Sequence, residues 1–406
     1  MSRNGSRPRI LVLNQYYWPG VEATAHLLTE LCEALAEDYE VEVVTGVLHG
    51  HEDEPRETEH KGVRIVRVAS TSYERSELAR RAANYFSYLG YALAYSLSRP
   101  APDLVLCMTD PPIVGDLGVA IGRRFRAPVL VISQDVFPEI ATELHRLRNP
   151  AVVGVLGTLV GAYLRRADRI VAIGETMRER LEAKGAPAER LRVIANWVDT
   201  RTITPQPRDN PWAERHGLVS RFVVMHSGNV GHAQDLDSLV RSATFLRDRD
   251  DVRIVIAGFG ARHAEMVELA ARLDVEDMVR FLPYQERDRL PFSLSSADVH
   301  VVGLAKGLAG YVVPSRLYGI LSAGRPVIAA AEDASETARL VREVGCGVVI
   351  PPSRPDLLAR TIREAAEGVH DLDEMGRRGR AYVEREADRL VAMERYRALV
   401  RELVRQ

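Results

Sequence analysis

The chain has 406 residues, enough for two or three domains that each bury their own core. A composition of 46% hydrophobic and 27% charged residues is typical of a soluble globular protein, and a net charge of −2 gives no electrostatic reason to expect binding to nucleic acid. The three cysteines, Cys32, Cys107 and Cys346, lie far apart, so we expect buried thiols in a reducing cytoplasm and neither disulfides nor a metal site. Residues 1–9 are polar and lack the apolar core of a signal peptide.

Strand-like apolar runs alternate with helix-length segments through the first half of the chain. Residues 9–15 are typical of a buried first strand, and residues 24–37 are typical of a helix. Further strands are expected at residues 41–46, 63–69, 103–109, 128–135 and 169–174. Continuous apolar strands joined by helical crossovers indicate a parallel sheet that is covered on both faces.

The same pattern restarts after residues 196–211, a polar segment with three prolines that is typical of an interdomain connector. Residues 221–231 read as a strand that runs into a glycine-containing loop, and residues 236–248 read as a helix. Further strands are expected at residues 252–260, 280–284, 298–304, 325–330 and 346–352.

The fold class predicted from this pattern is α/β, with two Rossmann-like, doubly wound domains that face each other across a cleft. The N-terminal domain is expected over residues 1–200 and the C-terminal domain over residues 201–388. An amphipathic C-terminal helix, residues 389–406, can pack back on the N-terminal domain. Ligands of such sheets bind beyond the carboxyl ends of the strands.

Three loops in the second half combine glycine or serine with a strand or helix end. Gly228 and Gly231 follow one strand, Gly258 follows the next, and a short helix begins near Ser315 beside Arg316. Taken singly, each loop could be an ordinary turn, and Arg316 could be a solvated side chain beside a capped helix. Because all three are expected at the carboxyl ends of one sheet, together they favour binding of a phosphate or nucleotide.

Polar residues also follow the strands of the first half. Gly20 permits a tight turn, Glu22 could bond a hydroxyl, and Thr109 begins the segment "TDPP". Asp135 lies directly after a buried strand, where it either faces the crevice or caps the following segment. The loop that holds Gly20 and Glu22 could equally be an ordinary connection between a strand and a helix.

Together these segments resemble the retaining glycosyltransferases of family four, which have the two-domain GT-B fold. The matching segments are "PGVEATA", "TDPP", "QDVFPE", "RADRIVAIGETMRERL", "VIANWVD", "HSGNVGHAQDLDSL" and "VPSRLYGILSAGRPVIAA". The most similar branch builds bacterial O-antigen, capsule and colanic acid and includes amino-sugar transferases. That branch usually has Pro-Ser-Lys-Leu where this chain has Arg316.

The resemblance implies a nucleoside-diphosphate sugar, from UDP or dTDP, bound by the C-terminal domain, and a glycan, lipid-linked or small-molecule acceptor bound by the N-terminal domain. It implies retention of the anomeric configuration without a metal or cofactor. Asp135 would orient the acceptor hydroxyl, Arg316 would stabilise the diphosphate, and Gly20, Glu22 and Thr109 would contact the acceptor. The donor-binding residues implied are Gly228, Asn229, Gly231, Gln234, Gly258, Leu282, Tyr284, Lys306, Pro314, Ser315 and Leu317.

The chain departs from the family at several of these positions. Tyr311 and Gly319 stand where much of the family has two glutamates, and Asn229 and Gln234 replace the usual arginine and lysine. Asp135 stands where the family frequently has a histidine. The alternatives are therefore a glycosyltransferase of secondary metabolism, a nucleotide-sugar 2-epimerase, and a non-catalytic subunit that binds sugar nucleotides.

Two apolar segments of the first half, residues 82–97 and 151–164, are flanked by arginines and fall short of the roughly 20 residues that span a membrane. Each is either a core helix or a surface that meets the membrane or a lipid-linked acceptor at the inner face of the membrane. Gly154, Gly157 and Gly161 favour a closely packed core helix for the second segment. The first segment, with four tyrosines and a phenylalanine, suits either interpretation.

Overall fold

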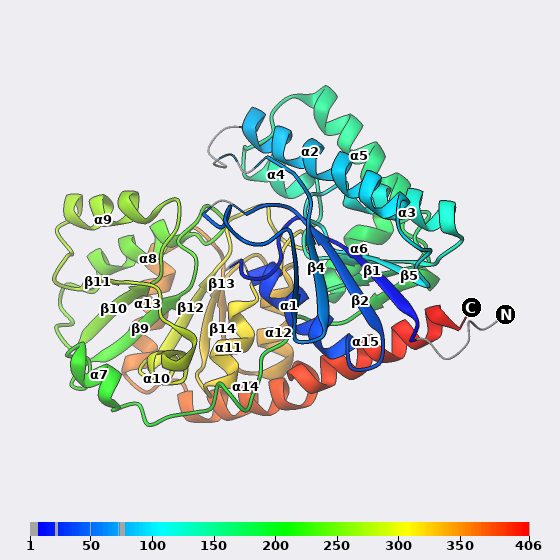
Figure 1. Cartoon of the computed structure of the whole chain (residues 1–406). Helices are drawn as coiled ribbons and strands as arrows, with labels where there is room; N and C mark the ends of the chain where they lie inside the picture. The colour runs from blue at the N-terminus through cyan, green and yellow to red at the C-terminus, as the bar shows by residue number, and fades with distance from the viewer. Residues whose placement is uncertain (1–6, 21–22, 49, 72, 74–77, 406) are drawn as a thin grey trace. The chain divides into compact units, whose positions relative to one another are not determined.

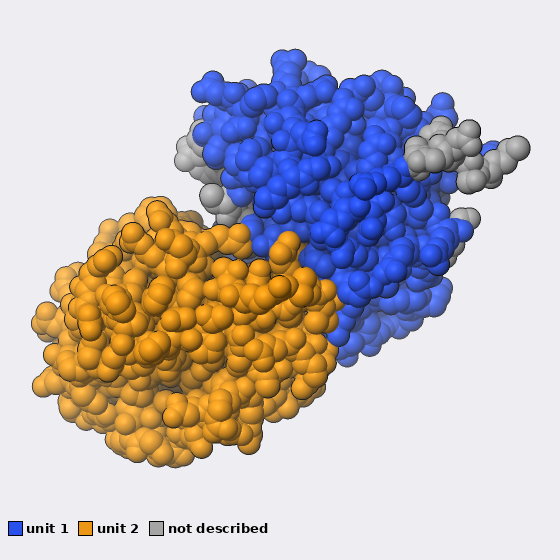
Figure 2. All heavy atoms as spheres, turned by 60° about the horizontal axis from the view of Figure 1, so that its bottom comes forward, with its two compact units in different colours: residues 1–194, 393–406 blue, residues 195–392 orange. Residues whose placement is uncertain are grey.

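The structure is a computed structural model that describes residues 7–20, 23–48, 50–71, 73 and 78–405. The chain divides into two compact units (Figure 2). Unit 1 contains the residues up to Ile194 and those from Met393 on, and unit 2 contains Ala195–Ala392. The sequence placed this division at residue 200, six residues later.

Unit 1 is built on a sheet of eight strands in the described part of the chain, in the order β3-β4-β2-β1-β5-β6-β7-β8. The strands are β1 (Arg9–Leu13), β2 (Glu40–Thr45), β3 (Glu57–His60), β4 (Val63–Arg67), β5 (Leu104–Cys107), β6 (Val129–Ser133), β7 (Arg169–Ala172) and β8 (Leu191–Val193). All neighbours pair in parallel except β3 and β4, which are antiparallel. The central strands β5 and β6 are buried along their whole length, as expected of strands with helices on both faces.

The helices of unit 1 cover both faces of this sheet. They are α1 (Ala23–Leu35), α2 (Leu78–Leu97), α3 (Val114–Phe125), α4 (Glu139–Glu143), α5 (Pro150–Leu164), α6 (Glu175–Ala183), the 3-10 turn η1 (Ala188–Arg190) and, from Met393 on, α15 (Arg389–Val404). Both α2 and α5 pack against α3, so these three helices form one layer (Figure 1). Arg397 of α15 donates a hydrogen bond to the carbonyl oxygen of Ala34 at the end of α1 (2.9 Å).

Unit 2 has a six-stranded parallel sheet in the order β11-β10-β9-β12-β13-β14. The strands are β9 (Phe222–Ser227), β10 (Val252–Ala257), β11 (Val279–Leu282), β12 (Val299–Gly303), β13 (Val327–Ala330) and β14 (Gly347–Ile350). In chain order this is 3-2-1-4-5-6, the strand order of a Rossmann sheet. The direction of winding reverses between β9 and β12, and parallel sheets bind their ligands at that point.

The helices of unit 2 bury a core on each face of its sheet. They are α7 (Pro211–Arg215), α8 (Leu236–Ser242), α9 (His263–Arg272), α10 (Leu290–Ser295), α11 (Arg316–Ser322), α12 (Glu336–Val344), α13 (Pro355–Ala366) and α14 (Leu372–Glu386), with the 3-10 turns η2 (Ala243–Phe245) and η3 (Arg287–Arg289). The helix expected over residues 236–248 is thus divided into α8 and η2.

The segment expected to be an interdomain connector, residues 196–211, is tied to unit 2. The Arg380 guanidinium donates hydrogen bonds to the carbonyl oxygens of Thr200 (2.9 Å) and Ile203 (2.8 Å). The Thr200 hydroxyl donates to a carboxylate oxygen of Asp388 (2.6 Å). Side chains of α14 and of Asp388 therefore hold residues 200–203 of the expected connector against unit 2.

Candidate functional site

The candidate site lies at the carboxyl ends of the strands of unit 2, where the sheet changes its direction of winding. Three loops meet there, after β9, β10 and β12. The amide of Gly228 donates to the carbonyl oxygen of Ala257 (2.9 Å), and the amide of Val230 donates to that of Phe259 (3.0 Å). The loops after β9 and β10 are thus joined through their backbones.

Glycine is required where these loops cross. A Cβ atom on Gly258, whose φ is +152°, would lie 1.8 Å from the carbonyl oxygen of Gly228. A Cβ atom on Gly303, at the end of β12, would lie 2.1 Å from the carbonyl oxygen of Gln234. Gly228 itself has a φ of +132°. Backbone therefore packs on backbone, which leaves the loop from Gly228 to Gly231 at the edge of the sheet with little side-chain cover.

Arg316, the first residue of α11, lies beside this loop. One of its nitrogens donates a hydrogen bond to the carbonyl oxygen of Gly303 (3.0 Å), and its Cδ lies 3.8 Å from where a Cβ atom of Gly228 would be. Burial lowers the pKa of Arg316 to about 10, and its buried Nε has no hydrogen-bond partner. Within the described residues no carboxylate is paired with Arg316. A partly buried cation without a counter-ion is unfavourable, and an anionic ligand would compensate it.

The structure supports one half of the sequence-based expectation for this position. That expectation combined the positive end of a helix that begins near Ser315 with the guanidinium of Arg316. The helix α11 is seven residues long, and the Ser315 side chain makes no capping hydrogen bond. The guanidinium, not the helix dipole, is therefore the main attraction for an anion.

His226 is a residue of this site that the sequence analysis missed. It is fully buried at the end of β9 and donates from Nε2 to the carbonyl oxygen of Asn229 (3.3 Å). Burial, and then the neighbouring Arg316, lower the pKa of His226, so the imidazole is neutral at physiological pH. A histidine within a strand pattern gives no sequence signal that distinguishes it from a core residue.

The remaining predicted donor residues fall into two groups. Asn229, Gly231, Gln234, Lys306, Pro314 and Ser315 lie in the loops at this edge. The Gln234 side chain accepts a hydrogen bond from the Gly231 amide (3.0 Å) and so shapes the loop, whereas Lys306 is exposed. Leu282 and Leu317 are buried in the hydrophobic core of unit 2, so the prediction that the Leu317 side chain binds a donor is corrected to a packing role.

Two exposed aromatic side chains mark the outer part of this edge. Tyr284 follows β11 and Phe259 follows β10, and both are largely exposed. The Phe259 ring lies 5.1 Å from the ring of His263. Tyr284 was predicted and Phe259 was not, although Phe259 directly follows the predicted Gly258.

The two positions where the family usually has glutamates do not supply a carboxylate. Gly319 faces Leu294 and Ile203, whose side-chain carbons would lie 3.8 and 3.9 Å from an added Cβ. The amide of Tyr311 donates to the carbonyl oxygen of Leu308 (3.1 Å). Arg316 and Lys306 thus remain as the cations that the sequence placed at this edge.

Unit 1 brings together polar residues at the carboxyl ends of β1, β5 and β6. The Asp110 amide donates to the Asn14 side chain (3.2 Å), and its carboxylate accepts from the Thr24 hydroxyl (3.3 Å). Burial, and then the negative charge of Asp110, raise the pKa of Asp135 to about 7. Asp135 therefore changes its protonation state near neutral pH.

The three residues predicted to contact an acceptor have different outcomes. The Thr109 hydroxyl accepts a hydrogen bond from the Gln134 amide (3.2 Å) and is buried, so it holds the loop that carries Asp135. The Gly20 amide donates to the carbonyl oxygen of Tyr17 (2.8 Å) in a tight turn. Glu22 lies outside the described residues.

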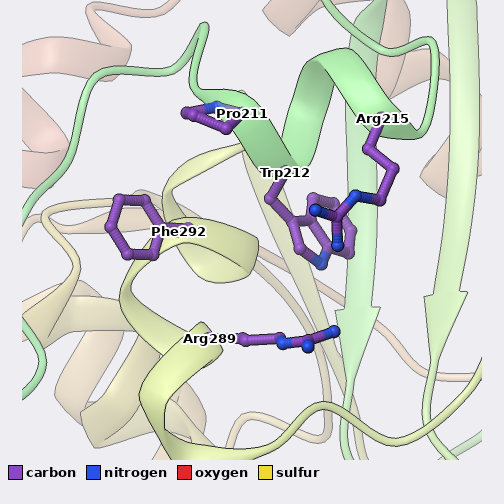
Figure 3. A pocket seen from close by; sticks show the side chains of 5 residues that line it. All are labelled: Pro211, Trp212, Arg215, Arg289 and Phe292. Atoms are coloured by element: carbon purple, nitrogen blue, oxygen red, sulfur yellow. The ribbon is translucent and has the colours of Figure 1, made fainter.

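A separate pocket of about 190 Å³ lies in unit 2 between α7 and the segment from η3 to α10. Figure 3 shows Trp212 and Arg215 projecting from α7, with Arg289 and Phe292 opposite. The Trp212 indole N–H donates to the Gln285 side chain (2.8 Å). None of the predicted donor-binding residues lines this pocket.

The described residues contain no group of three or more His, Cys, Asp or Glu side chains that could hold a metal ion. The three cysteines are free and buried. In the described part of the chain, no helix combines the length and the apolar character needed to cross a membrane.

The comparison with protein families identifies both halves of the chain. Residues 22–197 match the glycosyl transferase 4-like domain, and residues 211–382 match the glycosyl transferases group 1. The chain is a glycosyltransferase of the family-four, GT-B type. The predicted fold class of two Rossmann-like α/β domains is confirmed.

Two curated relatives of this glycosyltransferase come from Pseudomonas aeruginosa and Escherichia coli. The probable glycosyltransferase WbjE of Pseudomonas aeruginosa is 28% identical over 336 residues, which cover 80% of this chain and 81% of that protein. The putative colanic acid biosynthesis glycosyl transferase WcaI of Escherichia coli is 29% identical over 206 residues, half of each chain.

Solved structures share the fold of the whole glycosyltransferase. Anabaena HepE in complex with UDP aligns with a TM-score of 0.74 at 15% identity and covers 97% of this chain and 100% of that chain. Sucrose-phosphate synthase from Thermosynechococcus elongatus aligns with a TM-score of 0.78 at 17% identity and covers 98% and 99%. At these identities the likeness shows the fold alone.

Proposed function

We propose that this glycosyltransferase moves a sugar from a nucleoside-diphosphate donor to an acceptor hydroxyl, with retention of the anomeric configuration, in the synthesis of a bacterial surface polysaccharide or glycoconjugate. The single observation that carries the proposal is Arg316, which is half-buried with a buried Nε and has, among the described residues, no carboxylate partner beside the loop that begins at Gly228. A diphosphate supplies the negative charge and the acceptor oxygens that this arrangement lacks.

In this proposal unit 2 holds the donor. The diphosphate binds to Arg316 beside the loop from Gly228 to Gly231, and Lys306 can reach it from the end of β12. Tyr284 and Phe259 offer exposed aromatic faces for the nucleobase beyond β10 and β11. A nucleoside-diphosphate donor is also supported by the structural neighbour HepE, which has been solved with UDP and with UDP-glucose.

The reaction needs positioning and electrostatic stabilisation more than it needs an enzymic nucleophile. As the bond between the sugar and the diphosphate breaks, negative charge grows on the diphosphate. Arg316 is held by Gly303 in advance, so its charge stabilises that growing charge without reorganisation. Asp135 of unit 1, with a pKa of about 7, can accept a hydrogen bond from the acceptor hydroxyl once it is ionised.

The names of the relatives support an acceptor from polysaccharide synthesis. WcaI carries the description of a colanic acid biosynthesis glycosyl transferase, and WbjE that of a probable glycosyltransferase. A shorter match, 23% identical over 203 residues, is the alpha-D-kanosaminyltransferase of Streptomyces kanamyceticus, which belongs to the alternative of secondary metabolism.

Incubation of the protein with isotopically labelled UDP- and dTDP-sugars and a set of glycan and lipid-linked acceptors tests the proposal. We expect transfer of the label to an acceptor and release of one nucleoside diphosphate for each sugar transferred. Conversion of the donor to its epimer without transfer would replace the proposal with a 2-epimerase. Binding without either reaction would replace it with a non-catalytic subunit.

A further inference from the structure

The outer face of the helix layer of unit 1 carries an unusual set of side chains. We call it the α2–α5 face and define it by the exposed apolar residues of these two helices. On α5 these are Val152, Val155 and Leu159, and on α2 they are Phe86, Tyr91 and Leu97. Phe86 is 67% exposed and Val155 is 60% exposed, so these are not the edges of buried residues.

The spacing of these residues makes a stripe along α5, and on α2 it places Phe86 and Leu97, eleven residues apart, on one side of the helix. On α5 the exposed positions Val152, Val155 and Leu159 recur every three or four residues, which places them on one side of the helix. The whole of α5, 15 residues long, contains no charged side chain. Single exposed apolar residues are common on protein surfaces, but an uncharged exposed stripe of this length marks an interaction surface.

The core-helix interpretation of the two segments is therefore wrong for their outer sides. Nothing lies within 4 Å of a Cβ atom added to Gly154, and only Pro138 approaches one on Gly157, at 4.0 Å. The close packing occurs elsewhere in the layer, where a Cβ atom on Gly115 of α3 would lie 2.6 Å from the Tyr163 ring of α5. On α2 the inward residue is Tyr88, which is fully buried and donates to the carbonyl oxygen of Val44 (2.9 Å).

The charge around the α2–α5 face selects one kind of partner. Residues 78–97, 114–126 and 145–166 hold α2, α3, α5 and their ends, and they contain nine arginines but one acidic residue, Asp116. The arginines are Arg80, Arg81, Arg123, Arg124, Arg126, Arg146, Arg148, Arg165 and Arg166. The chain as a whole has a net charge of −2, so this excess is local. Both apolar stripes thus lie within a strongly cationic layer.

We propose that the α2–α5 face docks on the surface of an anionic phospholipid membrane. The apolar stripes enter the boundary between headgroups and acyl chains, and the arginines at the helix ends contact the phosphate groups. An exposed tyrosine and phenylalanine suit this boundary because aromatic rings are enriched at that depth. The inference concerns the surface of unit 1 alone and does not depend on the identity of the donor sugar.

Vesicle sedimentation tests this proposal with the full chain. The probes are vesicles of phosphatidylcholine and vesicles in which about a third of the lipid is phosphatidylglycerol. We expect the wild type to bind the anionic vesicles at least about tenfold more strongly than the neutral ones, and to lose most of this binding between about 0.05 and about 0.5 M salt.

Two variants separate the apolar and the ionic contributions. Val152→Gln/Val155→Gln/Leu159→Gln should weaken binding to anionic vesicles at least about tenfold, because three apolar side chains no longer enter the lipid. Arg148→Gln/Arg166→Gln should weaken it several-fold and flatten its salt dependence. The matched control is Phe245→Gln/Val369→Gln, which removes side chains of unit 2 that are 52% and 65% exposed, and it should bind like the wild type.

The outcomes that overturn the proposal are equally concrete. Equal binding to neutral and anionic vesicles, or the same loss in the control variant, would remove the α2–α5 face as the cause. If the wild type ignores vesicles and sediments as a dimer that the triple α5 variant converts to a monomer, the partner is a second copy of the chain. Circular dichroism and the melting temperature of each variant show that the fold is retained, and sugar transfer to a water-soluble acceptor shows separately whether the enzyme is active.

Discussion

Replacement of Arg316 by alanine removes the residue on which the proposed donor site depends most. Among the described residues, Arg316 makes one hydrogen bond, to the carbonyl oxygen of Gly303, and its buried Nε has no partner. At least one further hydrogen bond to a charged phosphate is therefore available, and such bonds contribute about 1.5–3 kcal/mol each. If this energy appears in the transition state, Arg316→Ala lowers kcat/KM about tenfold to about a hundredfold.

The same substitution should not weaken the fold. Burial lowers the pKa of Arg316 to about 10, which shows that the folded chain holds this cation at a cost. Without ligand, the melting temperature of Arg316→Ala should equal or exceed that of the wild type, because an uncompensated buried charge is removed. With a saturating nucleoside diphosphate, the wild type should gain stability and the variant should gain much less. Arg316→Lys should recover part of both effects, because a point charge can still reach a phosphate.

Arg325→Ala is the matched control for this experiment. Arg325 is another arginine of unit 2 whose pKa is lowered, chiefly by burial, and it donates to one carbonyl oxygen, that of Gln206 (3.4 Å). It precedes β13 and so lies at the amino ends of the strands, whereas the candidate site lies at their carboxyl ends. The assignment of Arg316 would be refuted if Arg316→Ala transferred sugar at the wild-type rate and gained as much stability from the nucleoside diphosphate as the wild type. It would also be refuted if Arg325→Ala lost as much activity as Arg316→Ala.

Three further substitutions test other parts of the account. Gly258→Ala should lower the free energy of unfolding, measured by urea titration, by about 2–4 kcal/mol, because the new Cβ would lie 1.8 Å from the Gly228 carbonyl oxygen. Its control, Gly154→Ala on the open side of α5, should raise the free energy of unfolding slightly. Asp135→Asn should lower the transfer rate and flatten its pH profile, since the wild-type rate should rise with pH through about 7 as the carboxylate ionises; an unchanged profile would remove Asp135 from the reaction. The raised pKa also means that ionisation of Asp135 costs stability as pH rises from about 4 to 7, so the variant should lose less stability over that window. Arg380→Ala should lower the free energy of unfolding by about 2–4 kcal/mol, because it leaves carbonyl groups of residues 200–203 without a donor. Replacement of the exposed Arg377 by alanine should lower it by less than about 0.5 kcal/mol.

The strands of both sheets could be predicted because their apolar runs are continuous and bounded by polar segments. The exceptions are the two edge strands of unit 1. The four residues of β3, "ETEH", are polar and alternate between exposed and half-buried positions, and β8 is only three residues long. An edge strand needs no apolar run, because only one neighbour and one face contribute to its burial. The pairing of β3 with β4 depends on a contact that no local pattern encodes.

The candidate site was predictable as a set of loops but not as a set of contacts. Glycine spacing identified the loops at Gly228 and Gly258, since the close backbone approach there tolerates no other residue. The orientation of α11 about its axis decides which of its side chains reach the site. It places Arg316 beside the loop and Leu317, the next residue, in the core. The exposure of α5 could not be predicted either, because an apolar helix reads the same whether it meets a core or a membrane.

A crystal structure of the chain with a nucleoside diphosphate tests the central claim most directly. We expect diphosphate oxygens within hydrogen-bond distance of the Arg316 guanidinium, beside the loop from Gly228 to Gly231. A diphosphate bound elsewhere, for example in the pocket lined by Trp212 and Arg289, with the loop at Gly228 empty, would contradict it.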